Sequence, residues 1–162
     1  MQMLQRILEI LEHNARLSDE QIAAMVGATP EAVAKMIANA QREGVIRGFK
    51  TVIDWDKTDR EICVARIELK VEPKSGLGFE EIAERVAQFD EVETVYLMSG
   101  GYDLALTVAS KSFKDVAMFV AHRLAPLDSV TSTSTHFILR KYKERGFIAT
   151  DIESDIREVL AP

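Results

Sequence analysis

A short run of small and acidic residues past the middle of the chain has the composition of a ligand-binding turn. Its two adjacent glycines let the backbone approach an anion closely, and their N–H groups suit the carboxylate of an amino acid. Asp103 follows and can meet an ammonium group, so we expect Asp103→Ala to abolish the response to such a ligand while sparing the fold. Two threonine hydroxyls on one side of a later predicted strand complete the set. The candidate ligand-binding residues are Ser99, Gly100, Gly101, Tyr102, Asp103, Thr133 and Thr135.

The same run also fits an ordinary hairpin turn. In that interpretation the glycines adopt positive φ, and Asp103 bonds to nearby backbone groups. Such turns are common, so the residues by themselves favour the plain turn over a ligand site.

A second polar group follows one face of a predicted helix that begins near residue 30. Lys35, Asn39 and Arg42 have side chains that can reach base edges or phosphates of DNA. Thr29 precedes the helix and can offer its hydroxyl, or the N–H groups of the helix start, to a phosphate. A polar stripe is also simply the wet face of a helix. The candidate DNA-contacting residues are Thr29, Glu31, Ala34, Lys35, Ala38, Asn39, Arg42, Arg47 and Lys50.

The residues most often used as metal ligands or nucleophiles form no such pattern. His13, His122 and His136 lie far apart and lack the spacing of a metal site. Cys63 lies within a predicted strand, where a small apolar core residue is its simplest role. We therefore predict no metal, no cofactor and no catalytic residues.

Composition limits the class of protein. The chain has 162 residues, 47% of them hydrophobic, which is enough to bury a core. No apolar run reaches the roughly 20 residues of a membrane span, and the amphipathic start lacks the features of a signal peptide. One cysteine cannot form an internal disulfide, so we expect a cytoplasmic protein that does not bind membranes. The net charge of −6 argues mildly against nucleic acid, but residues 1–57 hold seven basic and eight acidic groups.

Three short helices are expected in the first 44 residues. Apolar residues at helical spacing predict a helix to about His13. Ser18-Asp19-Glu20-Gln21 is a capping box for a second helix that stops at Gly27, and Thr29-Pro30 begins a third. The short turn between the last two predicts a helix-turn-helix. Residues 45–49 can add a small strand or wing.

The rest of the chain alternates between strand and helix patterns. Strands are predicted at 62–71, 92–98, 104–108 and 130–139, with helices beginning near residues 79 and 112. This order is that of the ferredoxin-like split βαβ fold. Its sheet has helices on one face only, so we expect a dimer to cover the other.

Across residues 4–145 the chain resembles the leucine-responsive regulator/asparagine-synthase regulator (Lrp/AsnC) family. The first half matches in Ile22-Ala23-x-x-Val26-Gly27-Ala28-Thr29-Pro30 and Glu43-Gly44-Val45-Ile46-x-Gly48-Phe49. The second half matches in Ser99-Gly100-Gly101-Tyr102-Asp103-Leu104 and Val130-x-x-Thr133-x-Thr135. The resemblance implies an α+β protein with an N-terminal winged helix-turn-helix and a C-terminal ferredoxin-like βαββαβ (RAM-type) domain. We place the DNA-binding domain at 1–50, a linker or connecting strand at 51–60, the regulatory domain at 61–145 and a tail with a short helix at 146–162.

The function that the resemblance implies is transcription regulation. Its partners are double-stranded DNA, a small-molecule effector such as an amino acid bound between dimers, and further copies of the chain in a homodimer or higher assembly. The effector shifts how dimers pack and so changes which DNA half-sites can be spanned.

The chain departs from the family pattern in the third helix. The family usually has two adjacent arginines there and a basic residue about one turn later, where this chain has Lys35-Met36 and Asn39. We therefore expect modest DNA affinity. Two alternatives stay open: a sirohaem-decarboxylase-like enzyme on the same fold, and a metabolite-binding oligomer that no longer binds DNA. The chain has no obvious Arg/His cluster of the kind that such an enzyme uses.

Overall fold

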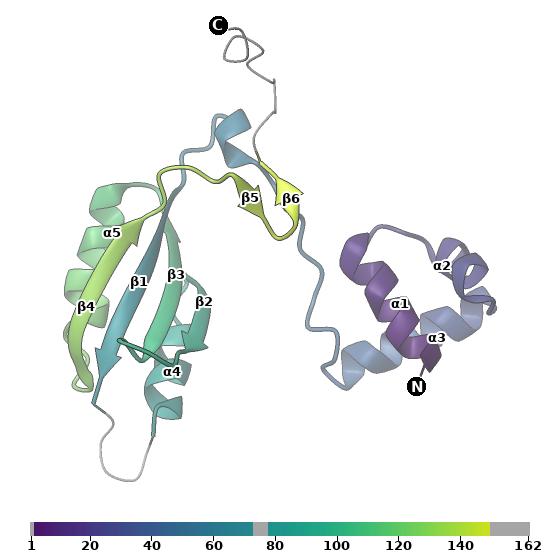
Figure 1. The fold of residues 1–162 in the computed structure, drawn as a ribbon, viewed down its shortest axis with the longest axis horizontal. Helices are drawn as coiled ribbons and strands as arrows, with labels where there is room; N and C mark the ends of the chain where they lie inside the picture. Colours follow the sequence, from purple (N-terminus) through teal and green to yellow (C-terminus); the bar gives the residue numbers. More distant parts are fainter. Residues whose placement is uncertain (1, 73–77, 150–162) are drawn as a thin grey trace, which may run out of the picture. The chain divides into compact units, whose positions relative to one another are not determined.

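The computed structural model describes residues 2–72 and 78–149 of the chain. The chain divides into two compact units, Met1–Thr51 and Val52–Pro162. Each unit has an apolar core of its own. Figure 1 shows the helices of the first unit and the sheet of the second.

The first unit contains three helices: α1 (Gln2–His13), α2 (Asp19–Val26) and α3 (Pro30–Arg42). The predicted capping box is confirmed, because Ser18 Oγ accepts the N–H of Gln21 (3.3 Å) and Gln21 Oε1 accepts the N–H of Ser18 (2.9 Å). Gly27 ends α2 in the left-handed region, with φ 71°. The two caps fix a short turn between α2 and α3, and the three helices enclose a core of Ile7, Leu11, Ile22, Ala23 and Val33.

The chain folds back on α3 once that helix ends. Gly44 has φ +73°, and the N–H of Ile46 donates to the carbonyl of Ala40 (3.0 Å). Residues 45–49, for which the sequence allowed a strand, form no strand. The described part of this unit is helical and offers these residues no strand to pair with.

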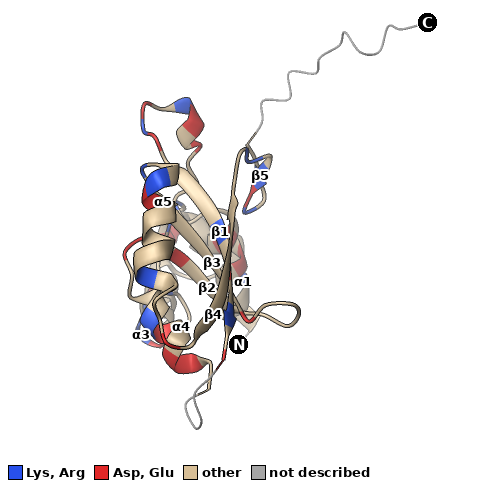
Figure 2. Cartoon of the chain, turned by 90° about the vertical axis from the view of Figure 1, so that its left-hand side faces the viewer, with Lys and Arg blue, Asp and Glu red and all other residues tan. Residues whose placement is uncertain are grey.

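The second unit is built on a four-stranded antiparallel sheet. Its strands are β1 (Cys63–Val71), β2 (Val92–Leu97), β3 (Leu104–Ser110) and β4 (Val130–Phe137), in the order β2-β3-β1-β4. Helix α4 (Glu80–Ala87) connects β1 to β2, and α5 (Phe113–Phe119) with the π-helical turn η2 (Val120–Leu124) connects β3 to β4. Both helices lie on the same face of the sheet, so the predicted βαββαβ arrangement is confirmed (Figure 2).

The two faces of this sheet differ in chemistry. Alternate residues of β1, including Cys63, Ile67 and Leu69, are buried with the apolar sides of α4 and α5. The intervening residues of β1, such as Arg66 and Glu68, lie on the face opposite α4 and α5. Alternation with period two thus puts the core on one side and a polar surface on the other.

Two segments differ from the sequence prediction. The predicted connecting strand at 51–60 is wrong, because no residue in it forms a strand and Trp55–Lys57 form the 3-10 turn η1, which Asp54 caps by accepting the N–H of Asp56 (3.2 Å). A small hairpin that the sequence did not predict, β5 (Lys143–Glu144) and β6 (Phe147–Ile148), spans the predicted boundary between the regulatory domain (61–145) and the tail (146–162). The short helix predicted in the tail, at about residues 151–160, lies outside the described residues.

Candidate DNA-reading helix and ligand-binding loop

Helix α3 is held by one side and presents the other to solvent. Its start is fixed by Thr29, whose Oγ1 accepts the N–H of Ala32 (3.3 Å), with Pro30 as the first helical residue. Val33 and Ala40 are buried in the core of the first unit. The exposed side carries most of the predicted DNA-contacting residues: Glu31, Lys35, Ala38 and Arg42 are exposed, while Ala34 and Asn39 are half-buried.

Two of the predicted DNA-contacting residues interact with each other. Nη2 of Arg42 donates to Oδ1 of Asn39 at 2.9 Å, one helical turn away. This hydrogen bond orients the guanidinium of Arg42 and occupies the amide oxygen of Asn39. Asn39 therefore positions Arg42. Sequence reasoning treated the two as independent, although an i, i+3 spacing places such side chains together.

The two basic residues after α3 are exposed and are not part of the helix. The guanidinium of Arg47 folds over the turn at Gly44, with Cζ 3.3 Å from the point where a Cβ on that glycine would lie. Lys50 lies further along the extended chain toward the second unit. The structure thus keeps Arg47 next to the end of α3.

The predicted ligand-binding run Ser99–Asp103 forms the loop between β2 and β3. The N–H of Met98 donates to the carbonyl of Asp103 (2.8 Å), which closes the loop. Gly100 has φ +148°, a value that favours glycine, and no atom lies within 4 Å of the position that a Cβ on Gly100 or Gly101 would take. The glycine backbone is therefore open to approach from outside, while Tyr102 is half-buried.

Asp103 has a structural partner that the sequence did not reveal. Its Oδ2 accepts the N–H of Val71 at 2.7 Å, and its own N–H donates to the carbonyl of Leu69 at 3.0 Å. The pairing of β1 with β4 is irregular between Lys70 and Val71. One carboxylate oxygen of Asp103 thus ties the start of β3 to the end of β1.

Thr133 and Thr135 lie on β4, on the other side of β1 from the loop. Thr133 pairs with Leu69 and Thr135 with Ile67, so both point toward the face that the helices cover, and both are half-buried. Asp103 and Thr133 therefore flank Leu69 from opposite sides, about 10 Å apart across two strand spacings. Thr135 lies two residues further from the loop.

A serine, a histidine and a glutamate meet on the open face of the sheet. Oγ of Ser134 lies 3.1 Å from Nε2 of His136, and Oε2 of Glu68 lies 3.6 Å from the same nitrogen. A catalytic relay needs the nucleophile and the orienting carboxylate on different ring nitrogens. This cluster therefore does not have the geometry of a hydrolytic triad.

The described residues, 2–72 and 78–149, contain neither a metal-binding cluster nor a membrane-spanning helix. No group of three or more His, Cys, Asp and Glu side chains there is placed to hold a metal ion. No helix in these two ranges combines the length and the apolar character that crossing a membrane requires.

Comparison with known proteins gave matches for both units. Residues 3–47 match the model of a winged helix-turn-helix DNA-binding domain, and residues 64–148 match that of the Lrp/AsnC ligand-binding domain. The chain is 48% identical over 157 residues to the HTH-type transcriptional regulator YugG of Bacillus subtilis, covering 96% of this chain and 95% of that one.

Solved structures share the fold. E. coli AsnC has a TM-score of 0.67 at 21% identity, with 93% of this chain and 98% of that one covered. The transcriptional regulator NMB0573 of Neisseria meningitidis, solved as an L-Met complex, has a TM-score of 0.70 at 19% identity, with 89% and 93% covered.

Proposed function

Because the chain belongs to the Lrp/AsnC family of transcription regulators, we propose that it contacts double-stranded DNA through α3 and responds to an amino acid bound in its second unit. The family and the relatives are DNA-binding transcription regulators and not enzymes, and nothing found supports a sirohaem-decarboxylase-like activity. We divide the chain into a DNA-binding domain at 1–50, a linker at 51–60 and a regulatory domain at 61–145, followed by a tail at 146–162.

The observation that carries the DNA-binding part is the exposed side of α3. Lys35 and Arg42 are the cations on this side, and Asn39 holds the guanidinium of Arg42 in place. An oriented guanidinium can bind a guanine edge or a phosphate with two parallel bonds. Thr29 caps α3, and the positive end of the helix would face a DNA phosphate. Arg47 and Lys50 would contact the DNA backbone.

DNA affinity is tested by fluorescence anisotropy with a labelled duplex from upstream of the gene, at several salt concentrations. Lys35→Ala and Arg42→Ala are compared with Lys114→Ala, which removes an exposed lysine from α5 in the other unit. A lost phosphate contact lowers the salt slope by about 1, and a lost base contact costs about 1–3 kcal/mol of discrimination. If both α3 variants bind every duplex like the parent, α3 is not the reader. If the parent itself does not bind, the alternative of an oligomer without DNA binding gains support.

For the effector we propose an amino acid at Ser99–Asp103, with Thr133 and Thr135 on β4, which lies beyond β1. The proposal is supported by the match to a ligand-binding domain, by the L-Met complex of the Neisseria protein and by the open backbone at Gly100 and Gly101. The glycine N–H groups would receive the carboxylate. Asp103, which uses one oxygen to hold Val71, would turn its negative charge toward the ammonium.

We further propose a homodimer and an assembly of dimers, in the cytoplasm where the DNA lies. The sheet carries α4 and α5 on one face only, so a second copy would cover the other face. A site between dimers would also complete the loop at Ser99–Asp103, which is open within one chain. Sedimentation velocity tests this proposal, and a stable monomer at micromolar concentration contradicts it together with the site between dimers.

A further inference from the structure

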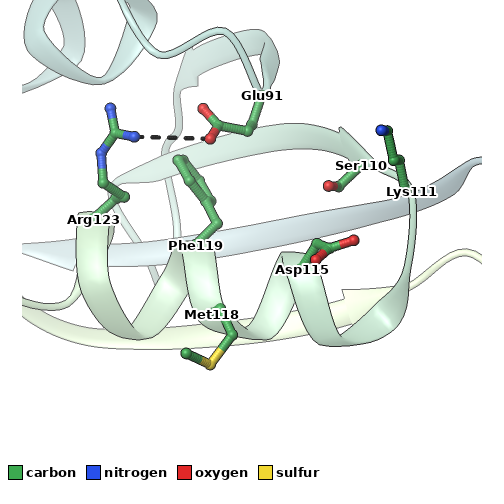
Figure 3. Close-up of a pocket in the computed structure, with 7 residues that line it drawn as sticks. All are labelled: Glu91, Ser110, Lys111, Asp115, Met118, Phe119 and Arg123. Carbon is green, nitrogen blue, oxygen red and sulfur yellow. Dashed lines mark ion pairs between the residues drawn. The ribbon is translucent and has the colours of Figure 1, made fainter.

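A polar hollow lies in the regulatory unit, away from the loop at Ser99–Asp103. It has a volume of about 440 Å³ and is lined by residues that include Glu91, Lys111, Asp115, Met118, Phe119 and Arg123 (Figure 3). We call it the α5 hollow. It lies at the Ser110 end of β3, whereas Asp103 precedes the Leu104 end, so roughly 20 Å of strand separates the two.

Arg123 is oriented within the hollow before any ligand arrives. Its guanidinium carbon lies 4.4 Å from the centre of the Phe89 ring, and that ring packs edge-on against Phe119, with 5.6 Å between ring centres. Nη1 of Arg123 lies 3.8 Å from Oε1 of Glu91. A cation fixed by an aromatic face loses little further freedom when it binds an anion.

The Glu91–Arg123 pair is open enough to admit a ligand between its charges. The distance of 3.8 Å is long for a charged hydrogen bond, and the side chains are 33% and 50% exposed. An exposed pair of this kind contributes little to stability. A ligand that separates or bridges the two charges therefore gives up little interaction energy between them.

At the opposite end of the hollow, near Ser110 and Lys111, the acidic side chain is already bonded within its own helix. Asp115 accepts a hydrogen bond from the hydroxyl of Ser112 (2.7 Å), which also caps α5 by accepting the N–H of Asp115 (3.1 Å). Its carboxylate is therefore committed to the helix start. Of the apolar lining residues, Met118 is 46% exposed and can contact a ligand's side chain, whereas Phe119 is only 5% exposed and packs against Phe89.

We propose that the α5 hollow binds a zwitterionic α-amino acid with an apolar side chain, as a second ligand site of this protein. The ligand's carboxylate binds the guanidinium of Arg123, its ammonium binds the carboxylate of Glu91, and its side chain contacts Met118. This site does not depend on the one proposed at Ser99–Asp103.

Two methionines make the sites distinguishable in one experiment. Met118 lines the hollow, and Met98 directly precedes the loop at Ser99. Protein labelled with 13C at the methionine methyl groups is titrated with L-leucine, and Met118→Leu and Met98→Leu assign the two signals. The probes for comparison are 4-methylpentanoate and 3-methylbutylamine, which are leucine without its ammonium and without its carboxylate.

We expect the Met118 signal to shift saturably with leucine and much less with either analogue. Arg123→Ala and Glu91→Gln each weaken the Met118 titration by about tenfold or more, because each removes a charged partner. The Glu91→Gln variant keeps the fold, since the carbonyl of Glu91 holds its loop by accepting the N–H of Ala109 (2.9 Å). Arg85→Ala, which removes an exposed arginine from α4 outside the hollow, leaves the titration unchanged.

The outcomes separate this site from the proposed effector loop. A shift at Met98 without one at Met118 overturns the second site and leaves the loop standing, and the reverse overturns the loop alone. If neither methionine signal shifts in folded protein up to millimolar leucine, both proposed sites are overturned. If 4-methylpentanoate and leucine bind equally well at Met118, the hollow is a simple anion site, and the proposal that it recognises a zwitterion is overturned.

Discussion

The bond from Val71 to Asp103 changes what a substitution at Asp103 should do. The carbonyl of Leu69 accepts the N–H of Asp103, so the backbone N–H and C=O of Leu69 point toward β3. Because a strand alternates with period two, the N–H of Val71 points the same way. Since β3 begins only at Leu104, the carboxylate of Asp103 supplies the acceptor that the strand itself does not reach. The sequence alone suggested that Asp103→Ala would spare the fold, and this geometry predicts a measurable loss of stability.

The expected size of the loss follows from the kind of bond. A hydrogen bond to a charged group contributes about 1.5–3 kcal/mol to folding. The bond is only partly buried, so water can reach the freed N–H and the lower end applies to Asp103→Ala. Asp103→Asn keeps an acceptor oxygen and should lose roughly half as much. For a domain of about 100 residues, 1.5 kcal/mol corresponds to a fall in Tm of roughly 6–12 °C.

Urea unfolding of the full-length protein, followed by far-ultraviolet circular dichroism, measures the loss. Parent and variants are compared at one protein concentration, because association would add to stability. Asp90→Ala removes an exposed acidic residue before β2 and serves as the control. If Asp103→Ala unfolds at the parent's midpoint, the bond to Val71 does not stabilise the sheet. The Asn variant also separates two roles, since it keeps the acceptor but loses the charge that an ammonium would need.

Two further predictions concern the caps and the thiol. Ser18→Ala removes the acceptor for the N–H of Gln21 and should lower the free energy of unfolding by about 1 kcal/mol; a circular dichroism melt like the parent's would show that the capping box is dispensable. Burial, with a smaller effect of the negative charge of Asp115, raises the pKa of the Cys63 thiol above its ordinary value of 9.0. Folded protein at pH 8 should therefore react with iodoacetamide more slowly than urea-unfolded protein, and equal rates contradict this. The raised pKa also means that the thiol's contribution to stability is present below pH 9 and falls as the pH rises above it.

The helices and the sheet were predictable because local signals and burial agree there. Ser18 with Gln21, and Gly27 followed by Thr29, mark helix ends through hydrogen bonds between residues that are close in sequence. The strands of the second unit alternate between buried and open residues, as β1 does from Cys63 to Val71. The prediction of a connecting strand at 51–60 was wrong because Asp54 and Thr58 cap a 3-10 turn there. The composition of the segment does not reveal this turn. The hairpin at β5 and β6 was missed because its strands have two residues each, although positive φ at Arg145 and Gly146 shows a tight turn.

The ligand sites show where sequence reasoning stops. The two-glycine run before Asp103 is visible in the sequence, but the partner of its carboxylate, Val71, lies 32 residues earlier and is identified only by strand register. The α5 hollow has no sequence motif at all, because Glu91, Lys111 and Arg123 come from three separate segments that the packing of α5 on the sheet brings together. Charged residues on loops and helix ends look alike in a sequence, whether they are solvated or converge on one space. What distinguishes Arg123 is that Phe89 and Glu91 hold it in place, and this orientation makes a surface cation a candidate for binding.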